Sequence, residues 1–308
     1  MDNLPLISVC VITYNSSKYV IEMLDSAYSQ NYPNIELIVS DDCSTDDTVE
    51  KIQQWLSEFG HKFTKAVLLT TPTNTGITAN CARAYKQAIG EWIKPIAGDD
   101  ILYPNAISSF VSFAAERKAE NIAIAVSSVK IFKDHPDNVL YIWPNFKISG
   151  NIRHQLRRQI VGSYIKSPGV FMKRSVLLEL GELNSNYPML DDDPLWIKFL
   201  TNGYKFHFNK DVLVGYRMHS NAISNGSLVP KKNFFPSLYA FKKELAFPLM
   251  KKERLYLNYF VQRREYKLYD RLINTEKISK LDKLQLRILY YLNVFFLSIY
   301  NVFYESFF

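Results

Sequence analysis

The sequence predicts an α/β protein with a mostly parallel sheet flanked by helices. Apolar, β-branched runs alternate with amphipathic runs from the N-terminus to about residue 132. The connections between these runs are short, as in folds where a helix links each pair of parallel strands. Polar pairs follow three of the runs directly, at residues 14–15, 41–42 and 99–100. Ligands bind at the carboxyl ends of strands in such sheets, so we expect one rim to gather these pairs.

Each element has its own signal. Apolar runs predict strands at 7–15, 35–42, 65–71, 91–100, 122–132, in the first part of 167–181, and at 212–224. Apolar residues at helical spacing predict helices at 16–33, 44–59, 78–90, 105–118, in the second part of 167–181, and within 187–203. Ser44 with Asp47 three residues later predicts a capping box for the second helix, and Gly90 predicts the end of the third. We expect residues 133–165 to be irregular.

Composition narrows the class of protein. The chain has 308 residues, of which 47% are hydrophobic, enough for one large domain or a medium domain with an appendage. Cys10, Cys43 and Cys81 show no CxxC spacing, so we expect neither a disulfide framework nor a zinc site. An acid near the start and Pro5 argue against a signal peptide, and a cytoplasmic location is predicted.

The C-terminal part has a different character. Residues 231–308 contain 15 Lys and Arg against 7 Asp and Glu, and 19 of the 44 aromatic residues. We therefore expect an α/β domain at 1–230 and a basic, aromatic helical region at 231–308. Residues 288–304 are 17 uncharged residues, at the short limit for a spanning helix. On a helical wheel the polar residues from Arg287 onward, among them Asn293, share one sector of about 140°, which favours a helix lying in a membrane interface.

We expect this region to dock on an anionic membrane surface, at the inner face of the cell membrane. The alternative is that these helices pack on the α/β domain or on a second copy of the chain, as in a homodimer. Nucleic-acid binding is not expected, because the aromatic residues follow helical spacing and no recognised motif is present.

The acidic clusters could carry chemistry. Asp99 and Asp100 would suit Mg²⁺ or Mn²⁺ bound also by substrate phosphates, although Gly98-Asp99-Asp100 could equally be a solvated turn. Asp41 and Asp42 could also be turn residues before a helix.

A third cluster lies at 191–193, before Pro194. Proline favours the first helical position, so Asp193 is expected to be a helix cap. That leaves Asp191 and Asp192, and a carboxylate near a sugar hydroxyl could act as a general base. His219 could bind a metal or a phosphate, or it could be structural.

Taken together, these segments resemble the family 2 glycosyltransferases, a large inverting group with the GT-A fold. The resemblance covers about residues 5–224 and is carried by six segments in family order: VITYN (11–15), VSDDCSTDDT (39–48), NTGITANCARA (74–84), GEWIKPIAGDDILYP (90–104), LDDDPLWIKF (190–199) and YRMHSNAIS (216–224).

The resemblance implies roles for individual residues. Nucleotide-binding positions would be Thr13, Tyr14, Asn15, Asp41, Asp42, Arg83 and Asp99. Within this set the Asp42 carboxylate would accept a hydrogen bond from a uracil N–H. Asp192 would be the catalytic base, with Asp191 in the place of a usual Glu. The metal, Mn²⁺ or Mg²⁺, would be bound by Asp99, Asp100 and His219.

Two departures from the family pattern matter. The commoner wording is Asp-x-Asp-Asp, but Ala97 fills the first acidic place, so the resemblance leaves open which of Asp99 and Asp100 binds the metal. The Gln-x-x-Arg-Trp motif of processive synthases is absent from the sequence, which implies transfer of a single sugar.

The resemblance therefore implies a metal-dependent, inverting hexosyltransferase. Its donor would be a UDP-sugar and its acceptor a saccharide or a polyprenyl-diphosphate-linked saccharide, in synthesis of a bacterial surface polysaccharide such as lipopolysaccharide O-antigen or capsule. The alternatives are a non-catalytic nucleotide-sugar-binding or membrane scaffold of the same fold, and a nucleotidyltransferase. Against the last, no Gly-rich loop follows the first strand.

Overall fold

The structure, a computed structural model, describes residues 4–143, 150–181, 183, 185–220, 228–275 and 277–305, with side chains as far as residue 299. The chain forms two compact units. The first comprises Met1–Ser149 and Ile165–His219 and contains the sheet. The second comprises Gly150–Tyr164 and Ser220–Phe308 and is helical.

One mixed sheet organises the first unit. Within the described residues it has nine strands, in the order β3-β2-β1-β4-β8-β6-β9-β5, with β7 paired to β6. The strands are β1 (Ile7–Thr13), β2 (Ile35–Asp41), β3 (Lys65–Leu69), β4 (Trp92–Ala97), β5 (Ile101–Leu102), β6 (Ile124–Lys133), β7 (Val139–Trp143), β8 (Val170–Lys173) and β9 (His207–Met218).

The pairing of β1 with both of its neighbours aligns three strand ends. β1 runs parallel to β2, with Thr13 opposite Asp41, and parallel to β4, with Ile12 opposite Ala97. The residues that follow these strands therefore emerge at the same edge. This confirms the predicted parallel α/β region, while the later strands β6 and β8 add antiparallel pairs.

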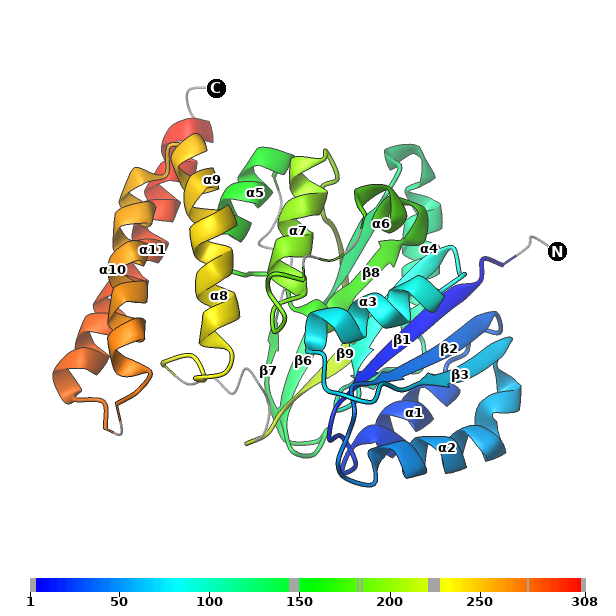
Figure 1. Ribbon diagram of the computed structural model, residues 1–308. Helices are drawn as coiled ribbons and strands as arrows, with labels where there is room; N and C mark the ends of the chain where they lie inside the picture. Colours follow the sequence, from blue (N-terminus) through cyan, green and yellow to red (C-terminus); the bar gives the residue numbers. More distant parts are fainter. Residues whose placement is uncertain are drawn as a thin grey trace. The chain divides into compact units, whose positions relative to one another are not determined.

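Helices cover both faces of the sheet. In the first unit they are α1 (Val20–Tyr28), α2 (Thr48–Phe59), α3 (Ile77–Gln87), α4 (Ala106–Glu116), α6 (Arg174–Leu180) and α7 (Asp192–Thr201). Side chains alternate between the faces of a strand, and β1 shows the result. Val9 and Val11 join the core with α1, α2 and α4, whereas the thiol of Cys10 points to the carbonyl of Ala84 in α3, which lies across β1 and β2 (Figure 1).

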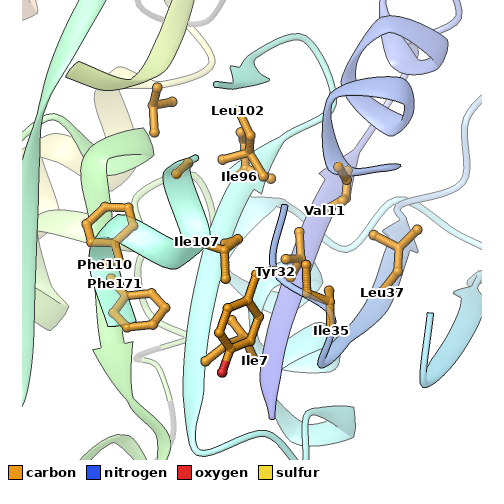
Figure 2. Close-up of a cluster of buried hydrophobic side chains, with 14 of the residues drawn as sticks. Ile7, Val11, Tyr32, Ile35, Leu37, Ile96, Leu102, Ile107, Phe110 and Phe171 are labelled. Carbon is orange, nitrogen blue, oxygen red and sulfur yellow. The ribbon is translucent and has the colours of Figure 1, made fainter. Parts of the chain in front are cut away.

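The main core lies beneath the sheet strands that carry the rim. Figure 2 shows Phe110 and Phe171 side by side in this core, and their ring centroids are 4.9 Å apart. Phe171 also stacks on Trp92 of β4 at 4.8 Å. All three side chains are buried, so β4 and β8 are held at a fixed position by close packing.

Three local predictions were wrong. The second helix begins at Thr48 without a side-chain cap, because Ser44 instead bonds to Asp41. Asp193 was expected to cap a helix, but it lies inside α7, which already begins at Asp192. The stretch 133–165, expected to be irregular, contains β7 and the helix α5 (Ile152–Val161).

Helix α5 belongs to the second unit, together with α8 (Phe235–Phe241), α9 (Phe247–Lys252), α10 (Tyr256–Leu272) and α11 (Lys280–Glu305). The buried Arg157 of α5 donates to Glu253 at 3.0 Å, and Arg153 donates to the same carboxylate at 2.7 Å. The compact units thus divide the chain differently from the boundary expected after residue 230, because α5 pairs with the C-terminal helices. The division of roles between the two regions stays a prediction.

Helices α10 and α11 form an antiparallel hairpin (Figure 1). Leu268, Leu272, Leu286 and Leu289 form its apolar contact, and Asn258 donates to the backbone and side-chain oxygens of Asn293 at 2.8 and 2.9 Å. Asn293 is therefore buried, whereas Arg287 in the same polar sector is exposed, so this sector does not face solvent along its whole length. Across the described part of the chain, none of the helices combines the length and apolar character that a membrane crossing requires.

Candidate active site

The carboxyl end of β1 is the centre of the rim. Thr13 is 1% exposed and donates to the Asp41 carboxylate at 2.8 Å, while its carbonyl accepts from the amide of Asp42 at 3.1 Å. Asp41, completely buried, also accepts from the backbone and hydroxyl of Ser44 at 2.8 and 2.6 Å. Neither Thr13 nor Asp41 is open to a ligand here, and together they fix the loop that follows β2.

The residues after β1 are accessible. Tyr14 is 49% exposed. Asn15 adopts a left-handed backbone conformation with φ of 49°, which asparagine tolerates better than most residues. Its side chain accepts from the Thr45 amide at 2.8 Å, and its own amide donates to Ser44 at 2.8 Å. Asn15 thus connects the loop after β1 to the loop after β2, while the neighbouring Tyr14 side chain stays exposed.

Asp42 connects the rim to the segment before α3. Its carboxylate accepts from the hydroxyl and amide of Thr75 at 2.5 and 3.0 Å, and from the amide of Gly76 at 2.7 Å. Arg83 of α3 adds an ion pair at 3.3 Å. Four donors therefore surround a carboxylate that is 2% exposed, and a uracil N–H would have to replace one of them.

Gly76 shows how closely the chain passes here. Its φ is +88°, a region that favours glycine, and a Cβ would meet the carbonyl oxygen of Pro188 at 2.6 Å. Thr78 donates through its hydroxyl to the Tyr187 carbonyl at 2.6 Å and through its amide to Pro188 at 3.1 Å. The start of α3 thus connects the loop after β2 to the segment that leads into α7.

Asp99 and Asp100 follow β4 and lie at the same rim. The amide of Gly98 donates to Ile12 of β1 at 2.9 Å, which places the turn next to Thr13. Asp99 is partly exposed, and its carboxylate lies 2.9 Å from Nε2 of His219, which follows β9. Asp100 is buried, and one of its oxygens accepts from the amide of Arg217 at 2.9 Å.

Arg217 is a site residue that the sequence analysis missed. Its side chain is 1% exposed and lies over the rings of Tyr19 and Phe132 at 4.3 and 4.7 Å. The guanidinium donates to the Asp99 carbonyl at 2.7 Å, to the Asp134 carbonyl, and to the Glu22 carboxylate at 2.6 Å. The only sequence signal was a cation within the apolar pattern of the last strand.

Asp99 and Asp100 offer carboxylate oxygens, the kind of ligand that Mg²⁺ and Mn²⁺ prefer, and His219 lies against Asp99. The second oxygen of Asp100 is buried without a hydrogen-bond partner, and burial together with the Asp99 carboxylate raises the pKa of Asp100 well above its usual range. In the described part of the chain, no three His, Cys, Asp or Glu side chains converge closely enough to hold a metal. An ion here would therefore need oxygens from its ligand, as Mg²⁺ and Mn²⁺ commonly do when they bind nucleotides.

Asp191 and Asp192 have different partners at the start of α7. Asp191 accepts from the Cys81 thiol of α3 at 3.4 Å, whereas Asp192 accepts from the amide of Asp193 at 2.7 Å. Burial raises the pKa of Asp192 well above its usual range, and the Asp193 and Asp191 carboxylates raise it further. Burial also raises the pKa of Asp191. A carboxyl with this property is suited to accept a proton near neutral pH.

Lys166 is a second residue that the sequence analysis missed. It precedes the short turn η4 (Ser167–Gly169), and its ammonium lies over the Trp143 ring, 4.9 Å from the centroid. Burial lowers the pKa of Lys166, and the Asp192 and Asp193 carboxylates oppose that change. The sequence offers an isolated lysine in an irregular stretch, with no pattern to indicate that it lies near α7.

Contacts join most of the predicted residues at one rim. Thr13, Asn15, Asp41, Asp42 and Arg83 are bonded to one another through β1, β2 and α3. Asp99, Asp100 and His219 meet beside them, and Cys81 connects α3 to Asp191. Residues 221–224 of the last family-like segment, YRMHSNAIS (216–224), lie outside the described residues.

A family model described as Glycosyl transferase family 2 matches residues 8–181, more than half of the chain. The chain belongs to this family. The match spans β1 to α6 and so includes every strand end described above except that of β9. This family membership favours glycosyl transfer over nucleotidyl transfer. The matched range ends before Asp192 and His219, so the roles of these two residues rest on geometry.

Bacterial glycosyltransferases are among the similar proteins. The chain is 28% identical over 225 residues to an uncharacterized glycosyltransferase of Rickettsia felis, which covers 70% of this chain but only 35% of that protein. It is 28% identical over 223 residues to WfaP of Escherichia coli, a UDP-Glc:alpha-D-GlcNAc-diphosphoundecaprenol beta-1,3-glucosyltransferase, with 71% and 80% of the two chains covered.

A solved structure confirms the fold. The crystal structure of residues 1–349 of Staphylococcus aureus TarS matches with a TM-score of 0.62 and 19% identity, over 98% of this chain and 90% of that one. The glycosyltransferase thus has the GT-A fold, with a mixed sheet, flanking helices and C-terminal helices.

We predict that Arg217→Lys lowers the free energy of unfolding by about 2–4 kcal/mol, since one ammonium cannot satisfy the acceptors that the buried guanidinium reaches. Urea denaturation followed by circular dichroism measures the change. Glu22→Gln is the control, because Glu22 is 43% exposed and its amide oxygen can still accept. That variant should change stability by less than about 1 kcal/mol. An Arg217→Lys protein as stable as the wild type would contradict the anchoring role.

Proposed function

We propose that this glycosyltransferase moves one sugar from a UDP-sugar to a hydroxyl of a saccharide acceptor, with inversion at the anomeric carbon. The acceptor would be lipid-linked, in the synthesis of a bacterial surface polysaccharide. The placement of Asp192 carries the proposal: it is a partly buried carboxyl of raised pKa at the start of α7, next to Asp191, which the Cys81 thiol of α3 contacts.

Relatives support the donor and acceptor classes. The name of WfaP specifies a UDP-glucose donor and a diphosphoundecaprenol-linked acceptor. A crystal structure of TarS 1–349 contains UDP-GlcNAc. TarS itself is named a poly(ribitol-phosphate) beta-N-acetylglucosaminyltransferase. WfaP and TarS thus share a UDP-sugar as ligand, while the acceptors in their names differ.

The rim offers an accessible surface for the nucleotide. We assign direct contact to Tyr14, Arg83 and Asp99, whose side chains reach solvent. Thr13 and Asp41 would act from below by holding the loops. Asp42 would position Arg83 and the backbone amides of Thr75 and Gly76, because its oxygens already accept their hydrogen bonds.

In the reaction, the Asp192 carboxylate takes the proton of the acceptor hydroxyl. The acceptor oxygen forms a bond to the anomeric carbon from the face opposite the diphosphate. The bond from that carbon to the diphosphate oxygen breaks, and UDP leaves with the bonding electrons. Attack from the opposite face inverts the configuration. Asp191 would raise the proton affinity of Asp192, since two neighbouring carboxylates resist being ionised together.

Asp99 and His219, with Asp100 beneath them, would hold Mn²⁺ or Mg²⁺. The bound ion would supply positive charge to the diphosphate as it departs. The pairing of Asp99 with His219 at 2.9 Å keeps both side chains directed to the same place at the rim.

We predict that Asp192→Asn reduces kcat for transfer by at least about 10²-fold, the usual contribution of a positioned general base. The asparagine amide is close in size to the aspartate carboxyl, so UDP binding should be nearly unchanged. The dissociation constant for UDP should stay within about threefold of the wild-type value, below the tenfold change that about 1.4 kcal/mol would cause. A panel of nucleotide sugars with a lipid-linked saccharide, with and without Mn²⁺, identifies the donor, and calorimetry measures UDP binding.

Asp193→Asn is the matched control at the next position: it should retain most of the activity near neutral pH, with the acid limb moved to lower pH because the Asp193 carboxylate raises the pKa of Asp192. Equal transfer by the wild type and Asp192→Asn would remove Asp192 from the role of base. UDP-sugar binding without any transfer by the wild type would favour the scaffold alternative.

We predict that Lys166→Met shifts the acid limb of the kcat/KM profile to higher pH. The base works as a carboxylate, so activity rises as pH rises through the pKa of Asp192. A nearby cation favours that carboxylate, and its removal raises the pKa further. On the acid limb, activity falls about tenfold for each unit of displacement. Lys166→Arg keeps the charge and should leave the limb in place. Equal limbs in both variants would show that Lys166 acts through packing on Trp143 instead.

A further inference from the structure

Helix α11 exposes an apolar stripe on the side away from α10. Its members recur at three- and four-residue spacing and so share one helix face. We call this set the α11 stripe: Leu281, Leu284, Ile288, Tyr291, Phe295 and Ile299, which are 38% to 68% exposed. Leu286, Leu289 and Asn293 occupy the opposite, buried face.

The α11 stripe is too extensive to be incidental. At 1.5 Å per residue it runs for about 27 Å along the helix. Soluble monomers rarely expose continuous apolar surface of this kind without a binding partner. The stripe is therefore an interaction surface, and the charges around it indicate the partner.

Cations border the stripe. At about 100° per residue, Lys280, Lys283 and Arg287 fall along one edge of it, and all three are exposed. No Asp or Glu occurs from residue 283 to residue 304. On α10, the exposed Arg263, Arg264 and Lys267 add to the same excess of positive charge in this unit. The partner must accept both apolar side chains and positive charge.

We propose that the α11 stripe inserts into the interface of an anionic phospholipid membrane. Acidic headgroups would meet the lysine and arginine ammonium and guanidinium groups, and the acyl boundary would receive the leucine, isoleucine and phenylalanine side chains. Tyr290 and Tyr291 are both exposed, and their rings suit the boundary between the two regions. The spacing also suits helix packing, but a second copy would bring like charges together.

Within the C-terminal region, the α11 stripe would be the face that contacts the membrane. The helix would lie along the membrane surface, because no helix among the described residues is suited to cross it. A lipid-linked acceptor is presented at that surface, but docking itself needs neither donor nor acceptor. Its test is therefore separate from the test of glycosyl transfer.

The experiment is sedimentation of the full chain with vesicles of phosphatidylcholine containing phosphatidylglycerol, and with pure phosphatidylcholine vesicles. We expect binding to the anionic vesicles, weaker binding at high salt, and little binding to the neutral ones. Ile288→Glu with Phe295→Glu should reduce binding at least about tenfold, since it places acids in the apolar stripe. Lys283→Gln with Arg287→Gln should reduce binding to anionic vesicles by about tenfold or more.

Ile89→Glu with Leu178→Glu is the matched control: these side chains are 59% and 56% exposed in the first unit. This variant should bind vesicles like the wild type. The proposal is overturned if the wild type stays in the supernatant, or if the stripe variant and the control bind equally. It is also overturned if the wild type ignores vesicles but forms a dimer that the stripe variant disrupts, because the stripe would then face a second copy.

Discussion

The parallel pairing of β1 with β2 on one side and β4 on the other is the constraint on which the site depends. Backbone hydrogen bonds fix this register, and a slip by one residue would turn every side chain to the opposite face. With Thr13 opposite Asp41 and Ile12 opposite Ala97, the polar residues after three separate strands emerge together. Phe110 and Phe171 stack in the buried core (Figure 2), and Phe171 also stacks on Trp92 of β4, which holds this strand in its register. Chemistry at the rim is thus a consequence of packing in the sheet.

This arrangement buries several charged groups, which is unfavourable, and hydrogen-bond donors compensate some of these groups better than others. The carboxylates of Asp41 and Asp42 each accept hydrogen bonds from several donors, so both side chains hold the rim in place. Asp100 and Asp192 are less well compensated, and burial raises the pKa of both. Lys94, buried in β4, has its pKa lowered to about 7 for the same reason. Groups whose charge is poorly compensated cluster at functional sites more often than elsewhere, which agrees with the roles assigned to Asp100 and Asp192.

The sequence predicted the strand ends well because their signal is local. An apolar run followed by Asp41-Asp42 or Asp99-Asp100 announces both the strand and its end. What it missed depends on partners far along the chain. Helix α5 looked irregular because buried polar residues interrupt its apolar pattern, and the ion pair with Glu253 makes Arg157 compatible with burial. Asn293 looked like a solvent-facing residue until Asn258 was placed against it. The roles of Arg217 and Lys166 depend on their interactions with Asp99, Asp134 and Asp192. No spacing in the sequence connects these residues.

We propose that the strand-end carboxylates and His219 surround one donor site. Crystals grown with UDP and Mn²⁺ test it most directly, since anomalous scattering locates manganese without assumptions about the protein. We expect a manganese ion at Asp99 and His219, bound also by the diphosphate, with the nucleotide beside Tyr14 and Arg83. Manganese and UDP bound together elsewhere on the chain, with Asp99 and His219 still paired to each other, would contradict it.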